Sequence, residues 1–369
     1  MGVKKKTFCF VLPVHLSHTI GGAQYQAGCL MNHIIASSKY HVYYITNLSD
    51  PDFTPINYKL IHIDTNYQKK SAYSLIRSSL YLLNLLDRIK PDIIYQRIGC
   101  YQTAVCAYYA KTRNCLSLFH ISSDKDVDSI ETSMGRNLLF RFFDRRMQKY
   151  GIHNSKKVIA QTHFQASLLE QNFNRTADAV VYNFHPIPPN HTTKDKTIRI
   201  VWVANVKNIK QPELFLKLAK DLHDGTGAIF TMVGKMQGNK RWCKHIQQQI
   251  RHTDGIEYLG AVSQESVNKL LSRSHLLVNT SHFEGFSNTF IQAWMRRVPV
   301  ISLHVDPDNL LQRRQIGRLS GNYDKLKQDV KEMIENDNLR KTIGENAFNY
   351  SLKNHSFENI NQIVKLIDL

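Results

Sequence analysis

The segment 284–300, EGFSNTFIQAWMRRVPV, holds the residues of this chain that are best suited to chemistry. Glu284 opens a short loop, and Ser287 or Asn288 is placed to cap the helix that follows. Gln292 follows Glu284 with seven residues between them, one turn inside that helix. A carboxylate, free amides at a helix start and a nearby polar side chain can bind anions and hydroxyl groups. An ordinary strand–loop–helix connection is the alternative interpretation.

Two further positions suggest contact with phosphate. Gly21 and Gly22 follow the first predicted strand and precede a helix, and paired glycines let backbone amides approach a phosphate closely. The segment is not the G-x-G-x-x-G fingerprint of dinucleotide sites. Lys210 stands two residues before Pro212, which suits the first position of a helix, so its ammonium would lie beside a helix N-terminus. A plain turn and a lone surface lysine are the alternatives.

His120 ends a predicted strand, and a loop rich in hydroxyl and acidic side chains follows it. In open parallel sheets ligands bind beyond the carboxyl ends of the strands, so His120 is placed to touch a substrate. A strand-end histidine bonded to backbone fits the pattern as well. Asp124-Lys125-Asp126 also matches an acidic D-x-D pattern, which leaves assistance by a divalent ion open.

Strands and helices alternate along the whole chain and provide the scaffold for these residues. The predicted strands are 7–12, 41–45, 59–63, 92–95, 116–121, 157–161 and 179–182, and then 198–204, 228–233, 256–259, 276–279 and 299–302. The predicted helices include 71–89, 137–150, 212–222, 240–251 and 264–272, and the chain from Asp324 on is helical and highly charged. This alternation predicts two doubly wound, Rossmann-like α/β domains with parallel sheets.

The domain boundary is marked by proline. The segment from His185 contains three prolines and ends in a charged run through Lys196, a composition typical of linkers. We therefore predict an N-terminal domain over residues 1–184, a linker over 185–196 and a C-terminal domain over 197–345. A last helical segment, 346–369, is expected to pack back on the N-terminal domain.

The chain of 369 residues is strongly basic, with 48 Lys and Arg against 30 Asp and Glu and a formal charge of +18. Such a charge favours a nucleic acid, an anionic lipid or a phosphorylated substrate. Residues 136–149, RNLLFRFFDRRMQK, form a basic amphipathic helix that can lie on an anionic membrane, or a core-facing helix with a solvated basic face. Because no RNP-like strand, zinc spacing or helix-turn-helix pattern is present, no nucleic-acid partner is expected.

The termini and the cysteines bear on localisation. The apolar run at the N-terminus is short, is broken by Pro13 and His15 and lacks a small-residue cleavage site, so it predicts a first buried strand and not a leader peptide. No run approaches the ~20 apolar residues of a membrane span. The six cysteines are scattered without a C-x-x-C pair, which indicates reduced thiols. We expect a cytoplasmic protein, soluble or bound peripherally to the inner face of the cell membrane.

Taken together, these features resemble the family 4 retaining glycosyltransferases, which have the GT-B fold of two Rossmann-like domains facing a central cleft. The resemblance is strongest over residues 198–317. It is carried by GGAQYQ, WVANVKNIKQPELFLKLA, FTMVGK, IEYLGAVSQESVNKLL, LLVNTSHFEGFSNTFIQAWMRRVPVISLHVDPDNLL and the IG at 316–317. It implies that the second domain binds a nucleotide sugar and the first domain an acceptor.

The same resemblance implies roles for single residues. Lys210 falls on a lysine that binds the diphosphate, and Gly22 on a loop that approaches the phosphates. Glu284 falls on the first glutamate of an E-x7-E pattern, near the transferred sugar, and Gln292 on the second, which binds ribose hydroxyls. His120 falls on a histidine near the sugar. Further donor contacts are expected at Gly21, Asn205, Gly234, Lys235, Phe286, Ser287, Asn288 and Thr289.

This chain departs from the family pattern at three positions. Gln292 replaces a glutamate, although a neutral amide can still bond to a ribose diol. Asn205 stands where an arginine usually binds the diphosphate, and Lys207 or Lys235 can substitute for that charge. Arg297 stands where a glycine usually precedes Val-Pro-Val.

The expected activity is transfer of a hexosyl-type sugar from a UDP- or GDP-sugar to a glycan or a lipid-diphosphate-linked glycan. The resemblance implies that transfer retains the anomeric configuration and needs no metal cofactor. The basic surface suggests a role in the biosynthesis of cell-surface polysaccharides. Two alternatives use the same scaffold: a catalytically impaired protein that only binds nucleotide sugars, and a nucleotide-sugar epimerase that needs no acceptor.

Overall fold

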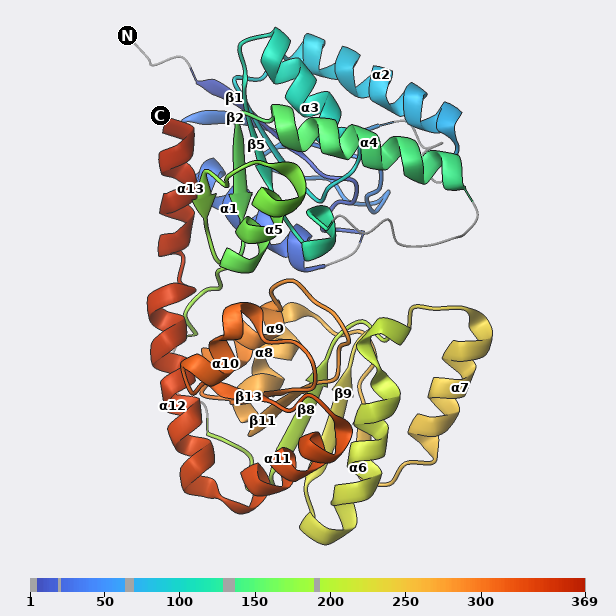
Figure 1. Ribbon diagram of the computed structural model, residues 1–369, viewed down its shortest axis with the longest axis vertical. Helices are drawn as coiled ribbons and strands as arrows, with labels where there is room; N and C mark the ends of the chain where they lie inside the picture. Colours follow the sequence, from blue (N-terminus) through green and yellow to red (C-terminus); the bar gives the residue numbers. More distant parts are fainter. Residues whose placement is uncertain (1–4, 19–20, 64–69, 129–136, 189–192, 369) are drawn as a thin grey trace. The chain divides into compact units, whose positions relative to one another are not determined.

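The computed structural model describes residues 5–18, 21–63, 70–128, 137–188 and 193–368. The chain divides into two compact units, Met1–Asn183 with Glu358–Leu369 and Phe184–Phe357 (Figure 1). These bounds differ from the predicted ones at both ends of the second unit. Phe184 and His185 are buried, so the described start of the predicted linker packs with the second unit. The last helical segment is divided, because only its end, from Glu358 on, belongs to the first unit.

The first unit contains a parallel sheet of seven strands in the order β3-β2-β1-β4-β5-β6-β7. The strands are β1 (Lys6–Val11), β2 (Tyr40–Thr46), β3 (Lys59–His62), β4 (Ile93–Arg97), β5 (Leu116–His120), β6 (Lys157–Ala160) and β7 (Ala179–Val180). Residues 8–12 have no exposed surface, and β1 pairs with β2 on one side and β4 on the other. The prediction of a first buried strand is therefore confirmed.

Helices follow most of these strands. They are α1 (Gly22–Ala36), α2 (Ala72–Ile89), α3 (Tyr101–Thr112), α4 (Leu138–Asn154), α5 (His163–Phe173) and α13 (Glu358–Asp368), with a short 3₁₀ turn η2 (Asp124–Asp126). Helix α2 begins where the sequence predicts, because the Ser71 hydroxyl accepts from the backbone amide of Ser74 at 3.1 Å. Its buried residues Leu75, Leu82 and Leu86 recur at the spacing of one helix face.

The second unit contains a parallel sheet of six strands in the order β10-β9-β8-β11-β12-β13. The strands are β8 (Arg199–Val203), β9 (Ile229–Val233), β10 (Ile256–Tyr258), β11 (Leu276–Asn279), β12 (Val300–Ser302) and β13 (Gly317–Leu319). The helices are α6 (Pro212–Thr226), α7 (Lys240–Arg251), α8 (Gln264–Arg273), α9 (Asn288–Trp294), α10 (Leu310–Arg313), α11 (Tyr323–Glu335) and α12 (Asp337–Asn354), with the 3₁₀ turns η3 (Asn208–Lys210) and η4 (Pro307–Asn309). Two doubly wound α/β units are thus present, as the sequence predicts.

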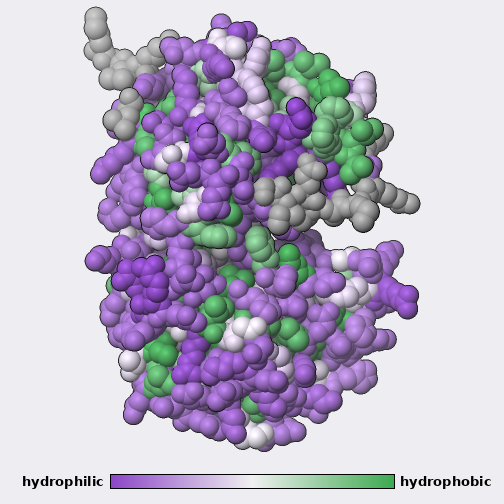
Figure 2. Space-filling model, viewed as in Figure 1, coloured by the Kyte–Doolittle hydropathy of each residue, from purple (hydrophilic) through white to green (hydrophobic). Residues whose placement is uncertain are grey.

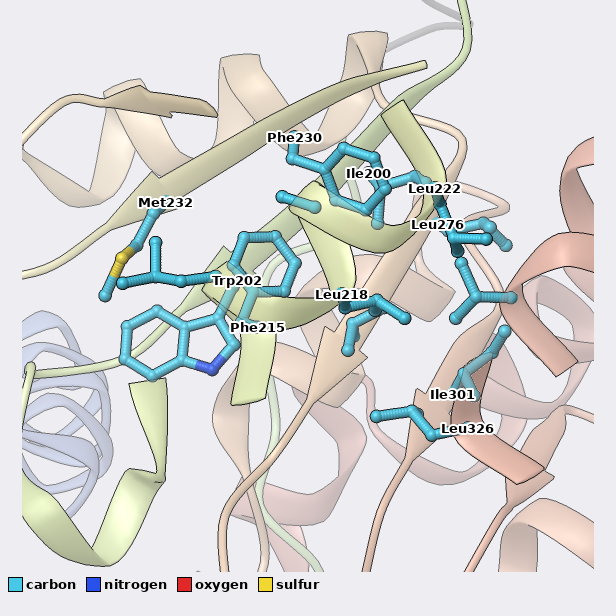
Figure 3. Close-up of a cluster of buried hydrophobic side chains, with 14 of the residues drawn as sticks. Ile200, Trp202, Phe215, Leu218, Leu222, Phe230, Met232, Leu276, Ile301 and Leu326 are labelled. Atoms are coloured by element: carbon cyan, nitrogen blue, oxygen red, sulfur yellow. The ribbon is translucent and has the colours of Figure 1, made fainter. Parts of the chain in front are cut away.

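A hydrophobic cluster of the second unit lies between its sheet and helices that include α6 and α11 (Figure 3). The ring of Trp202 from β8 stacks at 6.4 Å on that of Phe215 from α6, which in turn contacts Phe230 of β9 at 5.8 Å. Fully burying each such side chain contributes about 1.5–3 kcal/mol to folding. Because α6 is fixed on the sheet in this way, the turn that precedes it is also fixed at the carboxyl end of β8.

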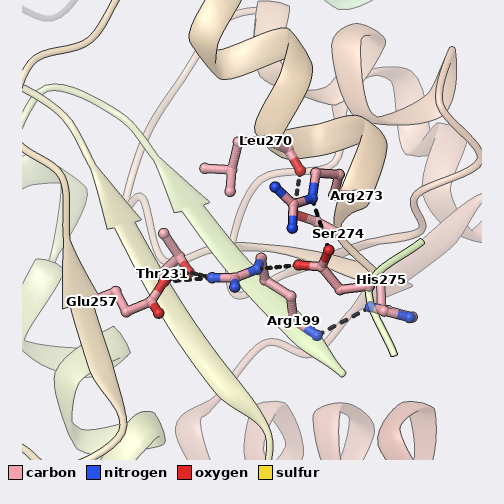
Figure 4. A network of polar contacts seen from close by, with 8 residues as sticks. Arg199, Thr231, Glu257, Leu270, Arg273, Ser274 and His275 are labelled. Atoms are coloured by element: carbon pink, nitrogen blue, oxygen red, sulfur yellow. Dashed lines mark hydrogen bonds and ion pairs between the residues drawn. The ribbon is translucent and has the colours of Figure 1, made fainter. Parts of the chain in front are cut away.

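A charged network fixes the opposite, amino end of β8 (Figure 4). Arg199 donates to Asp195 at 2.9 Å and to Glu257 of β10 at 2.5 Å, and Arg273 donates to the same Asp195 at 2.8 Å. The backbone amide of Arg199 also donates to the ring of His275, directly before β11, at 3.1 Å. The network therefore holds β8 in register with its neighbours without using any predicted site residue.

Strand β13 is absent from the sequence prediction. It has three residues, and its central Arg318 is paired at 3.0 Å with Asp329 and at 2.7 Å with Glu332. A strand this short with a charged centre lacks the apolar run on which the prediction depends.

Buried histidines predict loss of stability in mild acid. Burial lowers the pKa of His15 to about 4, and burial together with Arg296 and His355 lowers that of His185 to about 3. In the unfolded chain both groups titrate near ~6.5, so the unfolded state binds protons first as the pH falls. We expect the urea midpoint to be highest above about pH 6.5 and to fall continuously toward pH 4. An unchanged midpoint between pH 7 and pH 4.5 would contradict this assignment.

Candidate functional site

The order of strands changes direction between β8 and β11, which are neighbours at the centre of the second sheet. Connections that leave such a pair to opposite sides open a crevice at the carboxyl ends of the strands, where ligands bind in open α/β sheets. Lys210 follows β8 and Glu284 follows β11. The two residues singled out from the sequence therefore lie on the two loops that border this switch point.

Lys210 is held in place by the neighbouring loop. The hydroxyl of Thr280 donates to the carbonyls of Lys210 at 2.7 Å and Gln211 at 3.0 Å, and the amide of His282 donates to Ile209 at 2.9 Å. Pro212 then begins α6, as predicted. The lysine thus stands on a turn that is bonded to the loop after β11.

The side chains of Lys210 and Glu284 form an ion pair at 2.9 Å, with only 19% and 14% of their surfaces exposed. The same carboxylate oxygen, Oε1, accepts from Asn279 at 2.7 Å and from Ser281 at 2.6 Å. Burial alone would raise the pKa of Glu284, but Lys210 and these two donors outweigh burial and hold the pKa below its ordinary value. The site therefore presents an ammonium beside a carboxylate that is charged at neutral pH.

Asn205 and Lys235 lie at the carboxyl ends of two neighbouring strands, β8 and β9. The amide of Val206 donates to the carbonyl of Lys235 at 2.9 Å, which joins the two loops. Gly234 is required between them, because its φ is +150° and a Cβ there would meet the carbonyl oxygen of Ala204 at 1.7 Å. This close backbone approach places Asn205 and Lys235 on one edge of the sheet.

Replacing Gly234 by alanine is expected to destabilise the second unit by about 3 kcal/mol, because backbone and not a flexible side chain obstructs the new methyl group. Gly225 provides a matched control, since it lies in α6 with open space around it. There, alanine is expected to be neutral or to stabilise by up to about 1 kcal/mol. Chemical denaturation of both variants tests the difference, and equal midpoints would contradict the steric argument.

The start of α9 lacks the side-chain cap that the sequence predicts at Ser287 or Asn288. The ring of Phe286 is buried and packs at 5.0 Å from His355 and 6.2 Å from Trp294, so only its backbone can face a ligand. The hydroxyls of Ser287 and Thr289 are 2.8 Å apart, and Ser287 makes no capping bond to the helix. The side chain of Asn288 bonds to the ring of His185.

Gln292 is buried and faces α8. Its amide nitrogen donates to Gln264 at 2.8 Å and to Asn268 at 3.1 Å. A glutamate at this position would have no donor for these two carbonyl oxygens. Gln292, which stands where the family pattern has a glutamate, thus donates to two amide side chains on α8.

The structure accounts for Arg297. Its φ is +55°, and the amides of Val298 and Arg297 donate to Ala293 and Trp294 at 3.0 Å, which is the Schellman pattern that usually ends in glycine. Arginine at such a position costs roughly 1 kcal/mol. The guanidinium pairs with Glu345 at 2.6 Å and stacks 3.6 Å from the ring of Phe348, contacts that offset this cost.

The remaining candidates lie in the first unit. Gly21 precedes and Gly22 begins α1, whose first turn receives no side-chain cap. His120 ends β5 and is buried, with Nδ1 at 2.7 Å from the hydroxyl of Tyr95 and 3.3 Å from Arg97. These side-chain partners replace the backbone bond that was the alternative interpretation.

The acidic D-x-D segment has structural partners. One oxygen of Asp126 accepts from the amide and the hydroxyl of Ser122, each at 2.7 Å, and the other accepts from the amide of Gly99 at 3.1 Å. Asp124 accepts from Gln165 at 2.9 Å. Both carboxylates thus fix the loop after β5, and within the described ranges no cluster of three or more metal-binding side chains occurs.

Sequence reasoning missed the residues that position the candidates. Asn279 and Ser281 hold Glu284, and their signal is a polar Asn-Thr-Ser run that begins at the last residue of a buried strand. Tyr95 and Arg97 hold His120, and the signal is an arginine at the end of a strand that begins with the apolar residues Ile93 and Ile94.

Comparison with known proteins adds to this geometry. The family model described as "Glycosyl transferases group 1" matches residues 184–350. "Glycosyltransferase 1 domain-containing protein 1" of Xenopus tropicalis is 21% identical over 159 residues, 43% of this chain and just under half (46%) of that protein. The "uncharacterized glycosyltransferase MJ1178" of Methanocaldococcus jannaschii is 26% identical over 275 residues, 73% of each chain.

A solved structure shares the whole fold. The Anabaena protein Alr3699/HepE, crystallised with UDP and glucose, superposes with a TM-score of 0.77 at 15% identity over 99% of this chain and 100% of its own. In the part of the chain that the structure describes, no helix has the length and apolarity needed to cross a membrane. Residues 184–350, most of the second unit, thus match the glycosyl transferases group 1 family, and the two units carry the parallel α/β sheets of the GT-B fold.

Proposed function

We propose that this glycosyltransferase moves a hexosyl-type sugar from a UDP- or GDP-sugar to a glycan or lipid-diphosphate-linked glycan, with retention of configuration. The observation that carries the proposal is the partly buried ion pair of Lys210 and Glu284 at the switch point of the second sheet. The Anabaena protein with the same fold was crystallised with UDP and glucose, which makes UDP-glucose the first donor to test.

The proposed mechanism follows from charge. Cleavage of the bond between the anomeric carbon and the phosphate leaves negative charge on the departing diphosphate. A fixed cation aimed at this charge stabilises the transition state, and Lys210 has that role in the proposal. Lys207 on the same loop and Lys235 on the loop after β9 are further cations. Desolvation, and then the nearby ammonium of Lys210, lower the pKa of Lys207.

Glu284 orients the hydroxyls of the donor sugar in this proposal and does not attack the sugar. Its three contacts converge on Oε1, so Oε2 is the oxygen proposed to accept from the sugar. Gln292 is proposed to meet the ribose, with the amides at Gly21, Gly22 and the start of α9 near the phosphates. His120 is proposed to contact the transferred sugar.

Transfer is tested with radiolabelled UDP-glucose, UDP-N-acetylglucosamine and GDP-mannose and with lipid-diphosphate-linked glycans as acceptors. The proposal predicts a labelled product that requires both substrates and whose new anomeric bond keeps the configuration of the donor by NMR. Donor conversion without an acceptor would indicate an epimerase. Nucleotide binding without any product would favour the impaired binding protein, an alternative motivated by Asn205 and Gln292.

We also propose that transfer needs no divalent ion. The D-x-D carboxylates are engaged by Ser122, Gly99 and Gln165, which supports this expectation. Excess EDTA should leave the rate unchanged, and a rate restored only by added Mg²⁺ or Mn²⁺ would refute it.

The helix α4 supports a peripheral position on the inner face of the cell membrane. Four of its apolar side chains are 45–67% exposed: Leu138, Leu139, Phe142 and Phe143. Arg146 stacks 5.6 Å from Phe142, and Leu80, Val105 and Met147 line an adjacent groove of about 340 Å³. Figure 2 shows hydrophobic patches between polar side chains on the surface of the first unit. Arg136 of the predicted amphipathic segment lies outside the described residues.

Replacing Phe142 and Phe143 together by serine should reduce binding to phosphatidylglycerol vesicles about tenfold, because each ring can bury apolar area in the lipid interface. Leu259→Ser removes an apolar side chain of 48% exposure from the second unit and serves as the control. Vesicle co-sedimentation measures both variants. Equal binding of wild type and the double variant would remove α4 from the membrane proposal.

A further inference from the structure

A buried arginine lies beside His120 in the first unit. Arg97 ends β4 and is 1% exposed, and the register of the sheet places it directly opposite His120 on β5. Its guanidinium donates to the hydroxyl of Tyr95 at 3.2 Å and to Asn183 at 2.9 Å. It forms no ion pair with a carboxylate in the described part of the chain. Burying a cation among neutral partners costs several kcal/mol, so the fold gains little stability from this arrangement.

The contacts of Arg97 determine where the proton of His120 resides. An arginine nitrogen only donates, and Nη1 of Arg97 lies 3.3 Å from Nδ1 of His120. The Tyr95 hydroxyl accepts from the same Nη1 at 3.2 Å and lies 2.7 Å from Nδ1, so it donates its own proton there. Nδ1 therefore accepts from two donors and carries no proton, which leaves the proton on Nε2.

Burial and the adjacent Arg97 also lower the pKa of His120 well below its ordinary value, so the imidazole is neutral near pH 7. Nε2 of His120 and Nε of Arg97 are both buried and have no hydrogen-bond partner among the described residues. Both atoms carry hydrogens. The cluster therefore has unused donors, and the group it can bind is an oxygen that accepts.

We propose that Arg97, together with Tyr95, is a positioning residue that keeps His120 in the Nε2–H tautomer, so that His120 meets the substrate as a hydrogen-bond donor and not as a base. The ligand atom in this proposal is a hydroxyl or phosphate oxygen of the sugar nucleotide. The part that concerns substrate rests on the proposed function, since the contact of His120 with the sugar is itself proposed. The assignment of the His120 tautomer does not depend on the proposed function.

The tautomer is measured by ¹⁵N NMR on the full chain with labelled histidine, using His120→Asn to assign the signals. The expected spectrum shows a neutral ring protonated on Nε2, unchanged from pH 5.5 to pH 8. In Arg97→Met the Nδ1–H form or the imidazolium should become populated in this range. Tyr95→Phe removes one of the two donors and should shift the same signals less. Arg88→Met, an exposed arginine of the same unit, should leave them unchanged.

Activity gives a second, separate result. Arg97→Met is expected to lower kcat about tenfold with a smaller change in KM, and to introduce an acidic limb into the pH profile that wild type lacks. A wild-type ring protonated on Nδ1, or charged at pH 7, would overturn the proposal. So would Arg97→Met and Tyr95→Phe spectra that match wild type. If no transfer is found at all, the proposed function fails, while the spectra still decide the tautomer. If Arg97→Met does not fold, the spectra of wild type and Tyr95→Phe still decide the tautomer.

Discussion

Replacing Lys210 by methionine is expected to lower kcat/KM for sugar transfer by about 100-fold or more, the effect of removing a preorganised charge from a diphosphate leaving group. Methionine keeps most of the volume of the side chain, so the loss reports the missing ammonium. The ammonium is fixed 2.9 Å from Glu284 on a turn that Thr280 bonds to the next loop. The assay is product formation under conditions where donor is limiting.

The control for this variant is Lys220→Met, which removes an exposed charge from α6 in the same unit. It should retain wild-type kcat/KM. Because Lys210→Met leaves Glu284 without its cation, circular dichroism and a thermal midpoint are recorded for both variants. Near wild-type turnover of a folded Lys210→Met would remove this lysine from the site.

Replacing Glu284 by glutamine should also lower transfer about 100-fold while the protein stays folded. The amide oxygen can still accept from Asn279 and Ser281, but the charge that pairs with Lys210 is lost. Glu284→Ala should be equally inactive and less stable by about 1–3 kcal/mol, since two buried donors then lose their acceptor.

Glu335→Gln is the matched control, because this carboxylate is 61% exposed on α11 and belongs to no part of the site. Comparing initial rates and urea midpoints for the three variants separates the effect of the lost charge from the effect of the lost packing. If Glu284→Gln transfers sugar at the wild-type rate, Glu284 is a structural carboxylate that only holds the loop.

Much of the fold could be predicted because buried parallel strands are continuous apolar runs. The strand Leu276–Asn279 agrees with its prediction at both ends, and Lys240–Arg251 does so among the helices. The three-residue strand Gly317–Leu319 was missed because its charged centre is satisfied by residues of α11, a tertiary effect. The predicted linker shows the same limit, since proline content does not reveal that Phe184 and His185 are buried.

The candidate site was predictable where residue type alone restricts the chemistry. Glu284 and Lys210 follow neighbouring strands, and the structure brings them together. Phe286 shows what residue type does not reveal, because its ring packs inward on His355 and Trp294. Arg297 departs from the family pattern, and its residue type does not reveal why. Glu345 and Phe348, whose contacts offset the cost of its backbone conformation, lie on another helix.

The proposed function requires that the pair of Lys210 and Glu284 binds a nucleotide sugar. Isothermal titration of the full chain with UDP, GDP, UDP-glucose and GDP-mannose tests it most directly, with Lys210→Met and Lys220→Met titrated in parallel. We expect one nucleotide series to bind wild type and Lys220→Met alike and to bind Lys210→Met at least about tenfold more weakly. No binding by wild type to any of these nucleotides, or equal binding by Lys210→Met, would contradict it.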